Sequence, residues 1–209
     1  MSSIEKIAFY HNRRDEVPNQ LLARELVETK NITGIREIAA NLENRSKNVR
    51  SDCLKVLYEI GYLDPGLIAE FVEEFLKLLK SKDNRMVWGA MIGLATIADR
   101  RADEIWPQIE EIIRVTQTGT VITQVWGTRV LAKVSTAHEK YRTRILPVLL
   151  QQLRNCLARD VPTHVESMLR AMDRKNKDEV LSILEVRRAE MTPSQRARLN
   201  KVMKQIQAL

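Results

Sequence analysis

An internal repeat with a period near 38 residues constrains the fold of this chain more than any other feature. The tripeptide Val-Trp-Gly at 87–89 recurs at 125–127, and the equivalent position one period earlier is Val49. Each site opens a run in which apolar residues recur at spacings of three and four, which places them on one face of a helix. The recurrence therefore predicts a row of similar helical units.

A second amphipathic helix is predicted after each of these runs. Residues 72–75, 109–112 and 150–153 share two polar residues between two apolar ones. The apolar pair at i and i+3 falls on one helical face. We place Pro107 and Pro147 in the first turns of two of these helices, where a missing N–H loses no intrahelical bond. Each unit is thus a helix, a short turn and a second helix.

Extended along the chain, this unit predicts a single domain over residues 1–209 with about five helix pairs. A short helix from Ile4 to His11 precedes them. A capping helix over 192–209 follows, with Thr192 as its N-cap and Gln195 at the capping-box position. The first and last pairs match the others weakly, as capping repeats do. The predicted limits of the pairs are 17–44, 46–81, 83–118, 120–157 and 160–191.

The scarcity of turn-forming residues supports an all-α chain. The sequence contains 7 Gly and 6 Pro, and aromatic residues make up 5%. A β-sandwich needs more turn residues and more aromatic and β-branched positions. Cys53 and Cys156 are too few and too distant in sequence for a disulfide scaffold, so we expect reduced, packed thiols.

The first helices of three pairs resemble HEAT repeats. In that family the helix reads as an Asp near the turn, a Val-Arg pair and then apolar residues. Here Val49-Arg50, Val87-Trp88 and Val125-Trp126 occupy the position of the pair, so two units carry Trp in place of Arg. The resemblance implies a right-handed α-α superhelix, a HEAT-like solenoid, with second helices on its concave surface and first helices on its convex surface. Armadillo-type stacking is the close alternative. The matching stretches are 48–54, 83–90 and 125–131.

Two glycines four residues apart, Gly89 and Gly93, lie on one face of a predicted first helix. Glycine inside a helix costs about 1 kcal/mol relative to alanine. We therefore expect both to allow close packing of neighbouring first helices. Close approach of a ligand is the alternative.

No motif for catalysis or cofactor binding is present in the sequence. There is no glycine-rich phosphate loop and no HExxH, and His11, His138 and His164 are not spaced with cysteines as a zinc site requires. Adjacent carboxylates such as Glu73-Glu74 point in different directions on a helix, which favours a solvated face. We predict no catalytic residue, no metal site and no cofactor. Enzyme activity is left open, with a non-enzymatic role favoured.

The tryptophans allow two interpretations. Trp88 and Trp126 share one repeat position, with Trp106 between them. A packed ladder is the simpler interpretation, and stacking surfaces in a groove are the alternative. The second resembles the alkylated-base DNA glycosylases with a HEAT-like fold, which use tryptophans and an Asp around the lesion. Asp99 and Asp103 would then be the candidate acids, although the local motif of those enzymes is not matched here.

The positive charge is concentrated in the C-terminal part of the chain. Residues 1–123 hold 17 Lys+Arg and 19 Asp+Glu, a net of −2, whereas residues 124–209 hold 17 and 8, a net of +9. Such a field attracts phosphate backbones or acidic protein surfaces. The candidate macromolecule-binding residues are Trp88, Trp126, Arg129, Lys133, Arg142, Arg144, Arg154, Arg170, Arg174, Arg187 and Arg188.

These features predict a non-enzymatic scaffold or adaptor for another macromolecule, in the first place a protein, that binds through its concave face and basic C-terminal half. The alternative is a nucleic-acid-binding solenoid, including the repair glycosylase. The longest uncharged stretch, residues 86–98, is shorter than the roughly 20 residues that span a bilayer. No secretory signal is visible at the N-terminus. We therefore expect a cytoplasmic protein with no membrane contact, and the oligomeric state is left open.

Overall fold

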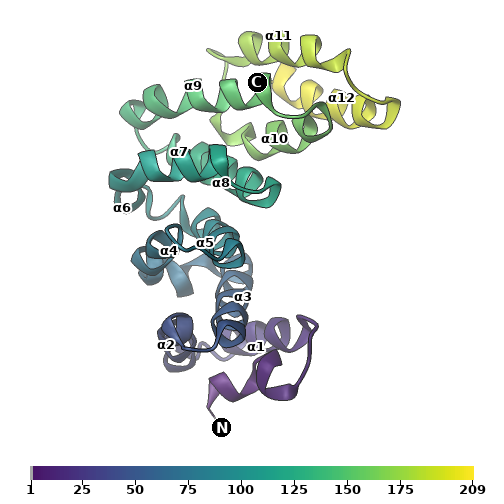
Figure 1. Cartoon of the computed structure of the whole chain (residues 1–209). Helices are drawn as coiled ribbons and strands as arrows, with labels where there is room; N and C mark the ends of the chain where they lie inside the picture. Colours follow the sequence, from purple (N-terminus) through teal and green to yellow (C-terminus); the bar gives the residue numbers. More distant parts are fainter. Residues whose placement is uncertain (1) are drawn as a thin grey trace. The chain divides into compact units, whose positions relative to one another are not determined.

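Helices make up the regular structure of this chain. The computed structural model describes residues 2–209, and over that range its regular elements are α-helices and short 3₁₀ helices, with no strand (Figure 1). The prediction of an all-α chain of about five helix pairs with terminal helices is confirmed. Within the described residues, no helix is both long enough and apolar enough to cross a membrane.

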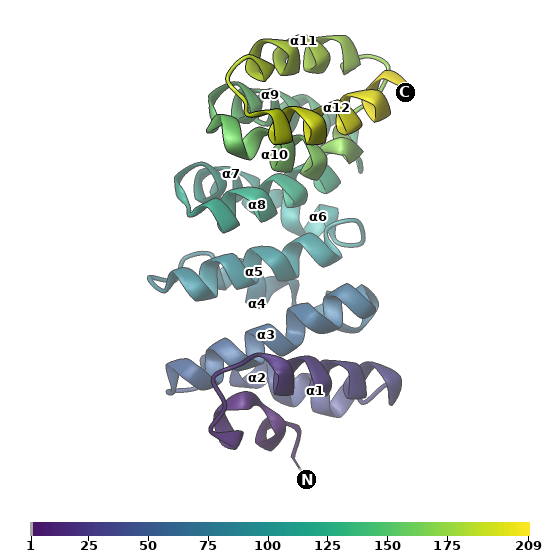
Figure 2. The same cartoon turned by 90° about the vertical axis from the view of Figure 1, so that its right-hand side faces the viewer.

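The first of two compact units ends at Ile105. Its elements are η1 (Ser3–Lys6), η2 (Ala8–His11), α1 (Val17–Glu28), α2 (Ile32–Ala40), η3 (Asn41–Glu43), α3 (Lys47–Leu63), η4 (Pro65–Phe71), α4 (Val72–Leu78), α5 (Asn84–Ile97) and α6 (Ala102–Ile105). The first helices α1, α3 and α5 form one layer, and the second helices α2 and α4 form the other (Figure 2). α3 packs against both α1 and α5. The core between the layers includes Leu57, Phe75 and Leu94, which are fully buried.

The second unit begins at Trp106. Its elements are η5 (Trp106–Gln108), α7 (Ile109–Thr118), α8 (Val121–Val134), α9 (Glu139–Asn155), η6 (Ala158–Asp160), α10 (Val161–Ser167), η7 (Leu169–Ala171), α11 (Lys177–Arg188) and α12 (Pro193–Gln207). α8 packs against α7, α9 and α10, while α11 packs against α9 and α12. The third helix pair therefore contributes α5 to one unit and α7 to the other. A single domain over 1–209 stays a prediction.

Side chains cap several helices where the loop ends and the apolar periodicity begins. Ser46, Asp83 and Thr120 each accept a hydrogen bond from a backbone N–H in the first turn of α3, α5 and α8, respectively. Thr192 and Gln195 form the reciprocal capping box that was predicted for α12. The first N–H groups of a helix lack intrahelical acceptors, so these caps specify where each helix begins.

Pro147, in the fourth helix pair, does not lie in the first turn of its helix as predicted. α9 begins at Glu139, so Pro147 lies in the helix interior and the predicted start beside it is wrong. Ile145, Leu149 and Leu153 are buried at intervals of four residues, which places them on one face of α9. Burial of this apolar face outweighs the backbone hydrogen bond that proline removes.

The N-terminal segment also differs from the predicted single helix. Residues from Ile4 to His11 fall in two 3₁₀ turns, η1 and η2, separated by Ile7 in an extended conformation. The Ala8 N–H donates to the Asn19 side chain at 2.9 Å, and the Phe9 N–H donates to Asp52 at 2.8 Å. These side chains take the backbone donors that a continuous helix would use.

The two glycines of α5 allow neighbouring helices to pack closely against α5. A Cβ atom at Gly89 would lie 2.6 Å from Leu54 Cδ2 on α3, and one at Gly93 would lie 2.8 Å from Phe75 Cε1 on α4. Leu54 and Phe75 are buried, so neither side chain has space to withdraw. The predicted packing of first helices is confirmed at Gly89. Gly93 makes room for a second helix instead.

Candidate macromolecule-binding site

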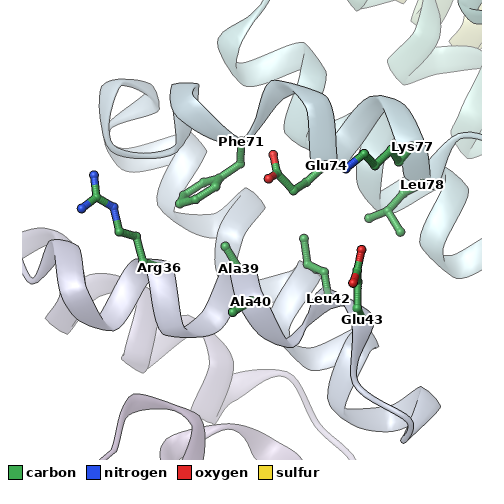
Figure 3. Close-up of a pocket in the computed structure, with 9 residues that line it drawn as sticks. All are labelled: Arg36, Ala39, Ala40, Leu42, Glu43, Phe71, Glu74, Lys77 and Leu78. Atoms are coloured by element: carbon green, nitrogen blue, oxygen red, sulfur yellow. The ribbon is translucent and has the colours of Figure 1, made fainter.

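A groove of about 460 Å³ opens between the second helices α2 and α4 of the first unit. Ala39 and Ala40 from α2 and Phe71 and Leu78 from the opposite side give it apolar walls (Figure 3). The groove exists because the side chains of α2 at this level are methyl groups, which leave the space between the two helices unfilled. Ala40 is exposed at its opening.

A carboxylate without a hydrogen-bond donor faces this groove. Glu74 projects from α4 into the space between the helices, beside the Phe71 ring (Figure 3). Its Oε2 atom is buried, and no donor reaches it among the residues that the structure describes. Arg36 also lines the groove, but both ends of its guanidinium fork donate to Glu70 at 3.1 Å. Because a buried carboxylate oxygen without a donor is unfavourable, this position is suited to a basic group from outside the chain.

A second, shallower groove lies between the second helices α9 and α11 of the second unit. Its volume is about 390 Å³, and Ile183 and Val186 supply its apolar surface. Val186 is 69% exposed, which is high for an aliphatic side chain on a helix. Arg154 and Glu179 form an ion pair of 2.7 Å at its edge. Each unit therefore has a groove between consecutive second helices.

The two repeat-related tryptophans are half-buried and make local contacts. The ring of Trp88 on α5 lies 6.3 Å from the ring of Tyr58 on α3. The Trp126 ring on α8 is covered by the guanidinium of Arg129, whose Cζ lies 4.2 Å from the ring centroid. Arg129 also donates to Ser167 at 3.3 Å. This cation–π contact covers one face of the Trp126 ring.

Most of the arginines that were predicted as binding residues have partners within the second unit. Arg142 donates to Asp173 at 2.7 Å and to the Ala171 carbonyl at 3.1 Å. Arg144 forms a two-bonded pair with Glu110 at 2.8 and 2.6 Å. Their guanidinium groups are thus used to join neighbouring helices and turns of this unit.

Arg187 is buried and has a structural role. It is 7% exposed and donates to the carbonyls of Leu153, Arg154 and Cys156 at 2.6–2.7 Å, which closes the C-terminal end of α9. Its sequence neighbour Arg188 points outward and pairs with Glu185 at 3.3 Å.

The remaining predicted basic residues are distributed over several elements. Lys133 is half-buried on α8, and Arg170 is exposed on η7. Arg174 donates to the Leu209 carbonyl at 2.8 Å. The role of these residues in binding a macromolecule stays a prediction.

The groups that the repair-enzyme alternative would use are exposed or belong to different units. Asp99 and Asp103 are exposed in the first unit, whereas Trp126 lies in the second. Among the described residues, no group of His, Cys, Asp and Glu is arranged to hold a metal ion. Burial raises the pKa of Cys53 to about 12 and that of Cys156 to about 11, so neither thiol is activated as a nucleophile.

The residues of the α2–α4 groove were not singled out from the sequence. Glu74 was interpreted as part of a solvated face, and Ala39 and Ala40 carry no motif. A hollow made by small side chains depends on what stands opposite them, which is 31 or more residues away in the chain. The only signal in the sequence was a pair of small residues at the end of a second helix.

No family model matches the sequence, and no curated protein matches it. Solved structures match the fold. An engineered protein determined by the Northeast Structural Genomics Consortium has 16% identity and a TM-score of 0.64, over 100% of this chain and 98% of that chain.

Two designed armadillo repeat proteins are also similar. One, solved in complex with the peptide (KR)4, has 12% identity and a TM-score of 0.66, over 88% of this chain and 85% of that chain. Another, computationally designed for modular peptide recognition, has 12% identity and a TM-score of 0.62, over 97% of each chain. At these identities the likeness concerns the fold alone, and it shows that this chain folds as an α-helical repeat solenoid similar to the designed armadillo repeat proteins.

Proposed function

We propose that this chain is a non-enzymatic scaffold that binds another protein through its second helices. The observation that carries the proposal is the groove between α2 and α4, which is open, about 460 Å³ in volume, and lined by both apolar and charged side chains. A rigid groove between packed helices loses little conformational entropy when it binds an extended segment. The groove between α9 and α11 offers a similar surface in the other unit.

The chemistry of the α2–α4 groove points to a segment with an apolar side chain next to a Lys or Arg. Ala40, Phe71 and Leu78 would contact the apolar side chain. The unpaired Oε2 of Glu74 would accept a hydrogen bond from the basic one, and such charge-assisted bonds are about twice as strong as neutral ones. Glu43, exposed at the rim, adds a second negative charge. Lys77, an exposed residue, also lines the groove.

The structural neighbours support a peptide-binding use of this fold. One of them is a designed protein in complex with a peptide of alternating Lys and Arg, and another was designed for modular peptide recognition. For the basic C-terminal half we propose electrostatic steering of a partner whose facing surface is acidic. Steering depends on the net charge, which is +9 over residues 124–209, and it persists although many of the arginines are paired.

Panning a random peptide display library against the purified full chain tests the proposal. We expect enrichment of peptides in which an apolar residue adjoins Lys or Arg. Substituting Ala40→Arg would fill the groove and repel the basic residue, so binding of the enriched peptides should weaken about tenfold or more, which corresponds to about 1.4 kcal/mol.

Ala197→Arg is the matched control, because it adds the same side chain at an exposed alanine of α12, outside the groove. Peptides selected on the wild-type protein should bind this variant unchanged. Enrichment no greater than on an uncoated support, or equal binding by A40R and the wild type, would contradict the proposal.

A further inference from the structure

A second hollow lies on the first-helix side of the first unit, where α1, α3 and α5 face the viewer in Figure 2. Its volume is about 410 Å³. Arg14 from the N-terminal segment, Asn48 from the start of α3 and Arg85 from the start of α5 line it. A smaller hollow shares Arg14 and Arg85 and extends to Tyr58 and Trp88.

Two acidic side chains beside these hollows are already paired. Asp15 accepts two hydrogen bonds from Arg13, at 2.8 and 2.9 Å, and these bonds lower the pKa of Asp15. Glu16 pairs with Lys55 at 2.6 Å. Asp15 and Glu16 therefore each have a cationic partner within the chain, although Lys55 also pairs with Glu59 at 2.6 Å.

Asp52, the acidic residue that lines both hollows, is also engaged. One of its oxygens accepts the Phe9 N–H at 2.8 Å, and the other accepts the Asn19 side-chain amide at 3.0 Å. These bonds hold the N-terminal segment against α3. The Asp52 carboxylate thus has a structural task and does not pair with the arginines of the hollow.

Arg14 and Arg85 have no such compensation. Both side chains are exposed, and within residues 2–209 neither guanidinium has an acidic partner or a hydrogen bond. The acid nearest to Arg85 in sequence, Asp83, caps α5 and pairs with Lys47 at 3.3 Å. Two uncompensated guanidinium groups therefore line one hollow.

We propose that this hollow binds a phosphate monoester. Guanidinium groups bind phosphate oxygens through two parallel N–H donors, and a phosphate monoester carries close to two negative charges at neutral pH, which matches two arginines. A ligand with a single carboxylate would neutralise only one of the two guanidinium groups. The Asn48 amide, on the same wall, can donate to a remaining oxygen. The hollow of about 410 Å³ is larger than a phosphate group, so the group that carries the phosphate has space beside Arg85.

Binding measurements with four probes at physiological ionic strength test this site. The probes are a phosphoserine peptide, its unphosphorylated twin, AMP and adenosine. We expect at least one phosphorylated probe to bind about tenfold or more tightly than its unphosphorylated counterpart, and the double variant Arg14→Gln/Arg85→Gln to abolish that preference. A preference for the peptide or for AMP identifies the source of the phosphate, and either result supports the site.

Arg24→Gln is the control, because it removes the same charge from an exposed arginine of α1 that does not line the hollows. The R24Q variant should prefer the phosphorylated probe by a factor that is within about twofold of the wild-type value. The proposal is overturned if phosphorylated and unphosphorylated probes bind alike. It is equally overturned if R24Q loses as much affinity as the double variant, because the effect would then follow net charge. Thermal unfolding of each variant verifies that the fold is retained.

Discussion

Single residues in this chain acquire their roles from the side chains opposite them. Gly93 is an example, because the ring of Phe75, which is 0% exposed, occupies the space where a Cβ atom would stand. A buried aromatic ring between two helices cannot move without displacing its own neighbours. Close packing of α5 against α4 therefore offsets the low helix propensity of Gly93.

Gly93→Ala should destabilise the protein, although alanine is the better helix former. Overpacking costs about 1–3 kcal/mol, and the gain in helix propensity offsets about 1 kcal/mol of that, which leaves a net loss of about 0–2 kcal/mol. Three atoms of the buried Phe75 ring would lie within 3.0 Å of the added Cβ, so we expect a loss in the upper half of that range. Urea unfolding, monitored by circular dichroism, measures this loss of unfolding free energy. Gly66→Ala is the comparison variant and should cost less, because its added Cβ has one close neighbour, the Asp64 Oδ1 atom at 3.1 Å, which needs to shift by only a few tenths of an ångström. If G93A were as stable as the wild type, the packing account of this glycine would be wrong.

At the scale of helices, the C-terminal end of α9 depends on one side chain from α11. The last carbonyls of a helix have no intrahelical donors, and a cation near them also interacts favourably with the helix dipole. Arg187 supplies both the donors and the charge, from 31–34 residues away in sequence. This contact links two consecutive second helices of the second unit.

Arg187→Met should therefore cost about 2–4 kcal/mol of unfolding free energy, because it leaves three carbonyls without their charged donor. Arg188→Met removes the same charge one residue later. Its exposed pair with Glu185 is expected to contribute less than about 1 kcal/mol. Chemical denaturation measures the loss of unfolding free energy in each of the two variants. Similar losses would show that Arg187 contributes only its charge and not the closure of α9.

At the scale of the whole molecule, stability should depend on pH through one buried histidine. His164 on α10 is 0% exposed, and its Nδ1 lies 3.4 Å from Oγ1 of Thr128 on α8. The Thr128 hydroxyl donates to the Gln124 carbonyl, so it can accept from Nδ1–H, while Nε2 is buried with no partner in the described chain. Burial lowers the pKa of His164, and the charge of Asp160 opposes this only in part.

The unfolded chain binds a proton at this histidine below about pH 6.5, whereas the folded chain resists it, so acid favours unfolding. The stabilising contribution is present above pH 6.5 and is lost as the pH falls, by at most about 1.4 kcal/mol per pH unit. The free energy of unfolding, measured at about pH 7.5 and pH 5.5, gives the slope of stability against pH. His164→Gln should reduce the slope and His11→Gln, at an exposed site, should not. Equal slopes in all three proteins would exclude His164 as the source.

Much of the helical framework could be predicted from the sequence because the signals are local. The spacing of apolar residues within about two turns specifies a helix, and the recurrence near 38 residues specifies that the units are alike. The capping box at Thr192 involves residues three apart, and it was predicted correctly. Pro147 shows the limit of this reasoning, because the buried stripe of α9 outweighed a local breaking signal.

The candidate sites were decided by contacts between residues distant in sequence. The net charge of +9 follows from composition, but only the tertiary structure shows that Arg142 is paired and Arg187 buried. The α2–α4 groove and the hollow beside Arg14 and Arg85 likewise form where separate helices meet. By itself the sequence determined an all-α repeat and the distribution of its charge, because periodicity and composition are properties of the chain. Which charges stay available for a ligand depends on which side chains the packing of helices brings together, and that was decided only by the tertiary structure.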